Sequence, residues 1–257
     1  MRNLLSTFAF VFVCACAFGQ YGDVGEVHLA NSGAPAAQPA FQHGVAELHD
    51  FEYGSAVKDF HAAEATDPNF AMAYWAEALT HVHPLWNYDD LDGGRAALNQ
   101  LAPTPEARAA KAATQREKDY LSAIEVLYGA GTRQQRWSKY ADAMGELHRK
   151  YPDDVDAAAF YALALMGTVA QHRDYAVYMR AAAVLEDYFP KYPRHPGVLH
   201  YLIHAYDDPV HAPLGMRAAK LYAADAPNAA HAQHMVSHIF IAMGMWPQVV
   251  AANERSI

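Results

Sequence analysis

Cysteine is almost missing from this sequence. The chain of 257 residues contains two, Cys14 and Cys16, and both lie in an apolar segment near its start. If that segment is removed as a leader, the rest of the chain has no cysteine. Disulfides, thiolate metal sites and cysteine nucleophiles are then excluded together.

Positive charge is scarce as well. Lysine and arginine number 19 against 28 aspartates and glutamates, which gives a formal net charge of −9 with histidine neutral. No long run of basic residues offsets this balance. Because nucleic acids are bound by basic surfaces, we expect no nucleic-acid partner.

Long apolar runs are confined to the start of the chain, and no later stretch is long enough to cross a bilayer. Residues 1–19 fit a signal peptide, since Arg2 is followed by an apolar core that ends at Ala17. Cleavage is expected after Ala17 or Gly19. The sequence therefore predicts a periplasmic or extracellular protein without a transmembrane segment, or alternatively a protein with a lipid anchor at Cys16.

Common catalytic motifs are also absent from the sequence. It has no glycine-rich phosphate loop, no His-Glu-x-x-His and no Gly-x-Ser-x-Gly. Ser237 precedes His238, but adjacent helix residues point apart, so they do not form a nucleophile and base. No reaction can therefore be assigned from a motif.

Alanine dominates the apolar 53% of the chain, and long β-branched runs are rare. This composition favours close-packed helices, and it predicts an all-α fold. Residues 20–39 are rich in Gly, Ala and Pro, and we expect them to form a flexible lead-in. Helical periodicity runs through residues 40–257, interrupted by proline and glycine at short intervals.

Internal repeats follow within this helical region. In residues 41–75, Gly44 provides a small residue for the first helix, and Ala78 lies 34 residues after it. The second helix carries core residues and a closing proline at Ala56, Phe60, Ala63 and Pro68. The unit resembles a tetratricopeptide repeat (TPR). The resemblance implies an α-solenoid of antiparallel helix pairs, a TPR-like superhelix.

Prolines repeat the same pattern later in the chain. Pro152, Pro193 and Pro227 each follow a large residue five positions earlier, and the last two lie 34 residues apart. Those large residues are Leu147, Tyr188 and Tyr222. The resemblance is to exported bacterial TPR-like proteins with His-rich repeats. It covers roughly residue 40 to the end, and it implies a concave groove for a peptide or protein partner.

Residues 84–119 depart from the repeat. We expect a short helix over Asp90–Leu101 and a long helix from Thr104, its N-cap, to Tyr128. A degenerate repeat explains this stretch better than a functional insertion. The chain stops part-way through the helix after Trp246 without a polar capping helix, so we expect a truncated repeat domain or pairing with another chain.

Histidine is the most informative residue type. Of 15 histidines, seven lie between His195 and His238. His200 and His204 are four residues apart, on one face of a helix, and His234 and His238 repeat this pair 34 residues later. His231 lies on the face of His234.

This pattern predicts a metal site. Axes of packed helices lie about 8–10 Å apart, and i, i+4 side chains about 5–6 Å, so the four imidazoles can converge on one point or on two closely spaced points. An all-nitrogen site suits zinc, copper, iron or nickel rather than calcium or magnesium. A metal-free polar groove and simple packing remain alternatives, and His195 and His211 are expected only at loops or helix starts.

The TPR resemblance implies that the two repeated histidine pairs face the concave groove, together with the neighbouring Asp207 and Asp208. In the same register, Phe41 and Trp75 would line the groove at its N-terminal end and contact a peptide or aromatic ligand. The alternative is that Phe41 and Trp75 pack between helices.

Two functions therefore follow from the sequence. The first is an exported binding or scaffold protein with a His-rich metal site on its concave face. The second is a metal-dependent redox or hydrolytic enzyme that uses the same histidines, with His231 or Asp207 as an additional ligand or acid/base group. A pH-responsive surface is a third possibility.

Overall fold

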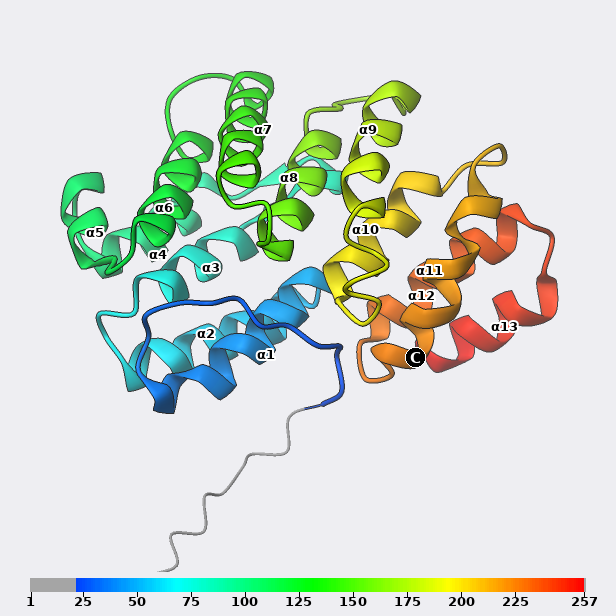
Figure 1. The fold of residues 1–257 in the computed structure, drawn as a ribbon, viewed down its shortest axis with the longest axis horizontal. Coiled ribbons are helices and arrows are strands. Elements are labelled where there is room, and N and C mark those ends of the chain that lie inside the picture. Colours follow the sequence, from blue (N-terminus) through cyan, green and yellow to red (C-terminus); the bar gives the residue numbers. More distant parts are fainter. Residues whose placement is uncertain (1–21, 257) are drawn as a thin grey trace, which may run out of the picture.

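Helices form nearly all of the regular structure in the computed structural model, which describes residues 22–256 (Figure 1). Consecutive helices pack against one another along the chain. This confirms the predicted all-α fold. The helices of the first half are α1 (Gln38–His49), α2 (Tyr53–Thr66), α3 (Ala71–Thr80), α4 (Leu91–Leu101), α5 (Pro105–Lys111) and α6 (Gln115–Leu127).

The second half continues with helices that also pack in sequence order. Those at the end of the chain lie on the right of Figure 1. These helices are α7 (Arg133–Lys150), α8 (Val155–Gly167), α9 (Tyr175–Glu186), α10 (Pro196–Tyr206), α11 (Ala212–Asp225), α12 (Ala230–Ala242) and α13 (Trp246–Arg255).

The predicted repeat residues lie where helices pack most closely. Ala56, Phe60 and Ala63 of α2 are fully buried. A Cβ atom on Gly44 would stand 2.7 Å from Cε1 of Phe60, so α1 and α2 approach too closely for any larger residue. The large residues before the three prolines are buried too, as expected: Leu147, Tyr188 and Tyr222.

The prediction of one long helix from Thr104 to Tyr128 is wrong. Thr104 does cap a helix, with its side chain accepting from the Ala107 amide, but α5 ends at Lys111. A second helix, α6, begins after Thr114. The Thr114 side chain accepts from the Glu117 backbone amide, and the Glu117 side chain accepts from the Thr114 amide. This reciprocal capping box starts a new helix after the extended residues Ala112 and Thr114.

A small hairpin occupies the region that departs from the repeat, and the sequence did not predict it. Strands β1 (Val82–His83) and β2 (Tyr88–Asp89) pair antiparallel around the 3-10 turn η2 (Pro84–Trp86). Asp89 anchors the hairpin to α7, because it accepts hydrogen bonds from Arg136 (2.9 Å) and from the indole of Trp137 (3.2 Å).

The segment before α1 is extended but packed, unlike the flexible lead-in that was expected. Residues 22–34 have no helix or strand, and the 3-10 turn η1 (Pro35–Ala37) leads into α1. Val24, Val27 and Leu29 are nonetheless buried. The Glu26 amide donates to the Arg194 carbonyl at 3.2 Å, which ties this segment to the second half of the chain.

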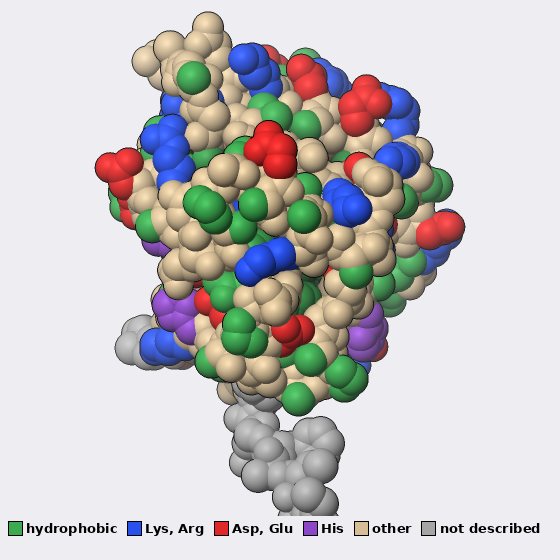
Figure 2. Space-filling view, turned by 90° about the vertical axis from the view of Figure 1, so that its left-hand side faces the viewer, with side chains coloured by type: hydrophobic (Ala, Val, Ile, Leu, Met, Phe, Trp, Pro, Cys, Tyr) green, Lys and Arg blue, Asp and Glu red, His purple; other side chains and the backbone are tan. Residues whose placement is uncertain are grey.

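The C-terminal end of α1 also packs against α10, far away in the sequence (Figure 1). On the face shown in Figure 2, basic and acidic side chains are interspersed, and neither sign forms a continuous patch. Over residues 22–256, none of the helices combines the length and apolar character needed to cross a membrane. The predicted signal peptide and Cys16 lie outside the described residues.

Candidate metal centre

Three histidines from two helices converge near the end of α1. His200 and His204 lie one turn apart on α10, and His231 lies in the first turn of α12. One ring nitrogen of each lies within 4.8 Å of those of the other two. We call these three residues the inner triad. Nitrogens bound to one zinc ion stand about 3.4 Å apart, so small ring rotations bring the triad to coordination distance.

The tautomer of His200 is set by its neighbour. Nδ1 of His200 lies 2.6 Å from the backbone carbonyl of His49 at the end of α1. Because a carbonyl only accepts, Nδ1 donates the proton and Nε2 keeps its lone pair. This arrangement, with one nitrogen held by an acceptor and the other directed inward, is typical of histidine metal ligands.

The Nε2 atoms of the inner triad lack protein partners. Nε2 of His200, of His204 and of His231 are all buried without a hydrogen bond. A buried polar atom without a partner costs about 1–3 kcal/mol, so three in one place are unusual for packing alone. A bound cation would satisfy all three.

The surroundings keep these imidazoles neutral. Burial, with the neighbouring imidazoles adding to it, lowers the pKa of His200 and of His204 well below the ordinary value. Burial and the nearby His234 and His238 lower the pKa of His231 to about 4. Neutral imidazole is the form that binds metal, so the triad needs no deprotonation at neutral pH.

The connector between α1 and α2 forms one wall of this site. Phe51 has a positive φ of 61°, an uncommon conformation for a large side chain. Its ring centroid lies 4.4 Å from that of His200 and 5.6 Å from those of His204 and His231. Glu52 accepts the backbone amide of His231 at 2.8 Å. The strained connector thus contacts all three members of the inner triad.

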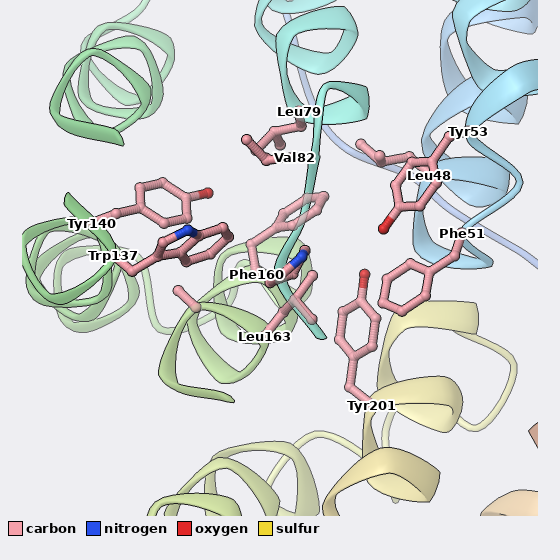
Figure 3. Close-up of a pocket in the computed structure, with 12 residues that line it drawn as sticks. Leu48, Phe51, Tyr53, Leu79, Val82, Trp137, Tyr140, Phe160, Leu163 and Tyr201 are labelled. Carbon is pink, nitrogen blue, oxygen red and sulfur yellow. The ribbon is translucent and has the colours of Figure 1, made fainter. Parts of the chain in front are cut away.

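A small apolar cavity lies on the other side of Phe51. Figure 3 shows the hydroxyls of Tyr53 and Tyr201 directed toward each other across this space, with Phe51 beside Tyr201. The cavity measures about 20 Å³, which is room for about one water molecule. Tyr201 donates to Nδ1 of His49 at 3.0 Å. The cavity is therefore too small for a substrate.

The other two predicted ligands form a separate group. His234 and His238 lie on the next turns of α12, and their Nε2 atoms stand 3.1 Å apart. We call them the outer pair. The ring centroid of His234 lies 6.2 Å from that of His231. The five histidines thus form two groups in the structure, three residues in one and two in the other, whereas the sequence predicted that four imidazoles would meet at one point or at two closely spaced points.

The proposed groove residues do not share a surface. Phe41 and Trp75 are fully buried, so the alternative, packing between helices, describes them. Asp208 turns inward to accept from the amides of Val210 and His211 in the α10–α11 connection. Of the two aspartates, Asp207 is the one that contacts a predicted ligand, with Oδ2 2.9 Å from Nδ1 of His238. The predicted groove register was wrong for Phe41 and Trp75, because aromatic residues of other parts of the chain, such as Phe70 and Tyr120, pack against their rings.

A second buried group contains histidines that sequence spacing did not connect. Oδ1 of Asp156 lies 3.0 Å from Nε2 of His49 and 3.1 Å from Nε2 of His195. His195 also accepts from the Val198 amide, as expected for a residue at a helix start. His49 accepts from Tyr201. Both rings use both nitrogens, so this group is a satisfied hydrogen-bond network and not a vacant ligand set.

Two further groups pair a histidine with two acids on α1, α2 and α3. In one, burial and then Glu77 raise the pKa of Glu64 to about 9, and His61 bonds Glu77 at 2.9 Å. The other consists of His43, Glu47 and Asp59. Each was missed because its third member, Asp59 or Glu77, comes from a neighbouring helix, although the other two residues of each group lie one turn apart on a single helix.

Comparison with known proteins adds no assignment to this geometry. No family model matches the chain, and no curated protein matches it.

Proposed function

We propose that this protein binds a transition-metal ion, zinc, copper or iron, through His200, His204 and His231. Two observations carry the proposal together: ring nitrogens of the three histidines lie within 4.8 Å of one another, and all three Nε2 atoms are buried without protein partners. Nitrogen ligands of this kind favour these metals over calcium and magnesium.

The scaffold of this centre is, in our proposal, an exported TPR-like α-solenoid. Repeated helix pairs with a 34-residue offset support the solenoid, and the pattern of residues 1–19 supports export. In such a scaffold, two ligands come from one helix and the third from a helix two positions later. The peptide or protein partner stays a prediction, because Phe41 and Trp75 do not contribute to a surface.

Metal content of the purified protein tests the proposal. After dialysis against micromolar Zn²⁺ and removal of free metal, elemental analysis is expected to find tightly held zinc. His204→Ala and His231→Ala each remove one of three ligands, and we expect at least a tenfold loss of affinity from either. These two are preferred to His200→Ala, because His200 also bonds the backbone of α1.

His172→Ala is the matched control, because His172 is exposed and lies outside the clusters of histidine and acid. It is expected to bind zinc as the wild type does. Circular dichroism in the presence of a chelator checks that all variants fold. Zinc binding unchanged in both ligand variants, or no binding by the folded wild type, would refute the proposal.

A metal-dependent enzyme is the second candidate. Only three nitrogens of the inner triad converge, which leaves one position of a tetrahedral ion for water or substrate. His204 and His231 are half-buried, and exposed Trp86 lies against His231 with ring centroids 5.6 Å apart, so the site reaches the surface. A zinc ion would supply a water acidic enough to lose its proton near neutral pH.

Hydrolysis of an activated ester, 4-nitrophenyl acetate, distinguishes the enzyme from a binding module. A zinc-loaded enzyme is expected to exceed the rate of the chelated protein, and His204→Ala is expected to abolish the difference. Equal rates with and without zinc would favour the binding module.

A further inference from the structure

The outer pair lies beside the inner triad but on a different part of α12. His234 is exposed and His238 is half-buried. Their rings are nearly perpendicular, at 89°, with centroids 5.0 Å apart, and their Nε2 atoms face each other at 3.1 Å. The contact between these two nitrogens has to be explained, because a neutral imidazole has one donor and one acceptor nitrogen.

Each ring has its other nitrogen occupied by an acceptor. Nδ1 of His238 lies 2.9 Å from Oδ2 of Asp207, a carboxylate that can only accept. Nδ1 of His234 lies 3.1 Å from Oδ1 of Asn253 on α13. The amide nitrogen of Asn253 donates to the Val249 carbonyl at 2.9 Å, which fixes which end of the amide faces the ring.

Both Nδ1 atoms therefore donate, and both Nε2 atoms carry lone pairs. Two lone pairs at 3.1 Å repel each other and cannot form a hydrogen bond. Two nitrogens that share one metal ion stand about 3.4 Å apart, close to the separation observed. Asp207 and Asn253 supply the outer hydrogen bonds that usually orient histidine ligands.

We propose that His234 and His238 hold a second transition-metal ion, bound more loosely than the ion of the inner triad. Solvent completes its coordination, because the structure directs two protein nitrogens to it and His234 is exposed. The proposal goes beyond the function proposed above, since the outer pair has its own ligands and its own supporting residues. It stands or fails separately from the inner triad.

The location suggests how this second ion would be used. His231, a member of the inner triad, also approaches the outer pair: its ring centroid lies 6.2 Å from that of His234 and 5.1 Å from that of the fully buried His200. The imidazoles thus form a path from the surface to the buried nitrogen. An ion captured by the outer pair has a short transfer distance to the inner triad.

Titration of the full chain with Zn²⁺ in a calorimeter counts the two ions. The wild type is expected to bind two equivalents, the second at least tenfold more weakly. His234→Ala and His238→Ala are each expected to bind one, tightly. His204→Ala is expected to retain the weak equivalent, and the control His172→Ala to bind two.

Asp207→Leu tests the supporting residue. Leucine has nearly the shape of aspartate but offers Nδ1 of His238 no acceptor, so the ring loses the bond that keeps its proton on Nδ1 and its lone pair on Nε2. We expect the weak affinity to fall by about tenfold or more, with the tight equivalent unchanged. A role of Asp207 in folding alone would not produce this selective loss.

Two results would overturn the proposal. A wild type that binds a single tight equivalent would mean that a proton shared by the two rings, and not a metal ion, occupies the space between them. Two equivalents in His234→Ala and in His238→Ala would place the second ion elsewhere. A wild type that binds only the weak equivalent would refute the inner triad, but it would still support the second ion at the outer pair.

Discussion

His231 shows how one side chain links the proposed metal chemistry to protein stability. Burial, and after it His234 and His238, lower its pKa from 6.5 to about 4. Between these two pH values the unfolded chain carries a proton on this residue and the folded protein does not. The folded state therefore loses stability through His231 as the pH falls from 6.5 to about 4.

The substitution His231→Gln removes this contribution to the pH dependence of stability. In the presence of a chelator, the free energy of unfolding of the wild type is expected to fall relative to that of His231→Gln by up to about 1.4 kcal/mol per pH unit over this range. Urea unfolding at pH 7, 6 and 5 measures the gap. Comparing the two proteins cancels contributions from other titrating groups. A gap that does not change with pH would show that His231 titrates normally in the folded state.

The candidate ligands could be predicted from sequence because their spacing is local. The i, i+4 pairs of α10 and α12 and their 34-residue offset need no tertiary information. Their division into an inner triad and an outer pair could not be predicted. It depends on the His49 carbonyl at the end of α1, on the Phe51 ring in the connector after α1, and on Asn253 from α13.

Helix starts were predictable in part at the scale of single elements. Helix α4 begins after Asp90, as expected, and the Asp90 side chain accepts a hydrogen bond from the Gly93 amide. The break at Thr114 was missed because helical periodicity continues across it, and only the capping box marks the boundary. The hairpin of β1 and β2 was missed because two-residue strands are too short to show alternation.

Asp174 provides a test of such a cap. Its Oδ1 accepts from the Ala176 and Val177 amides at 3.0 and 3.2 Å, at the start of α9. Asp174→Ala leaves these amides without their partner, and we expect a loss of about 1 kcal/mol in the free energy of unfolding. Asp142→Ala, in the exposed middle of α7, is the control, and it is expected to change stability by less. Equal losses in a urea titration would contradict the assigned cap.

At the scale of the whole molecule, Asp156 ties together three helices that are distant in sequence. Its Oδ1 bonds His49 at the end of α1 and His195 before α10, while Asp156 itself belongs to α8. Burial raises the pKa of Asp156, but His195 and His49 lower it by more, so the carboxyl is charged in the interior. One charge thus holds the first helix against the second half of the chain.

Removal of this carboxylate is expected to loosen the whole assembly. Asp156→Ala leaves two buried ring N–H groups without acceptors, and we expect a loss of about 3 kcal/mol in the free energy of unfolding. Zinc affinity of the inner triad is expected to fall as well, because the backbone of His49 orients His200. Thermal unfolding with and without Zn²⁺ measures both, with exposed Asp153→Ala as the control. A fully stable Asp156→Ala protein would mean that the network contributes nothing.

The hydrogen bond between His200 and the His49 carbonyl spans 151 residues of sequence. Contacts this distant form late when a chain folds, whereas the two histidines of α12 are one turn apart as soon as that helix exists. A newly made chain in the presence of metal would therefore offer paired imidazoles long before the complete triad is assembled. Refolding without metal, followed by its addition, is the order of steps that avoids trapping ions on partly folded chains.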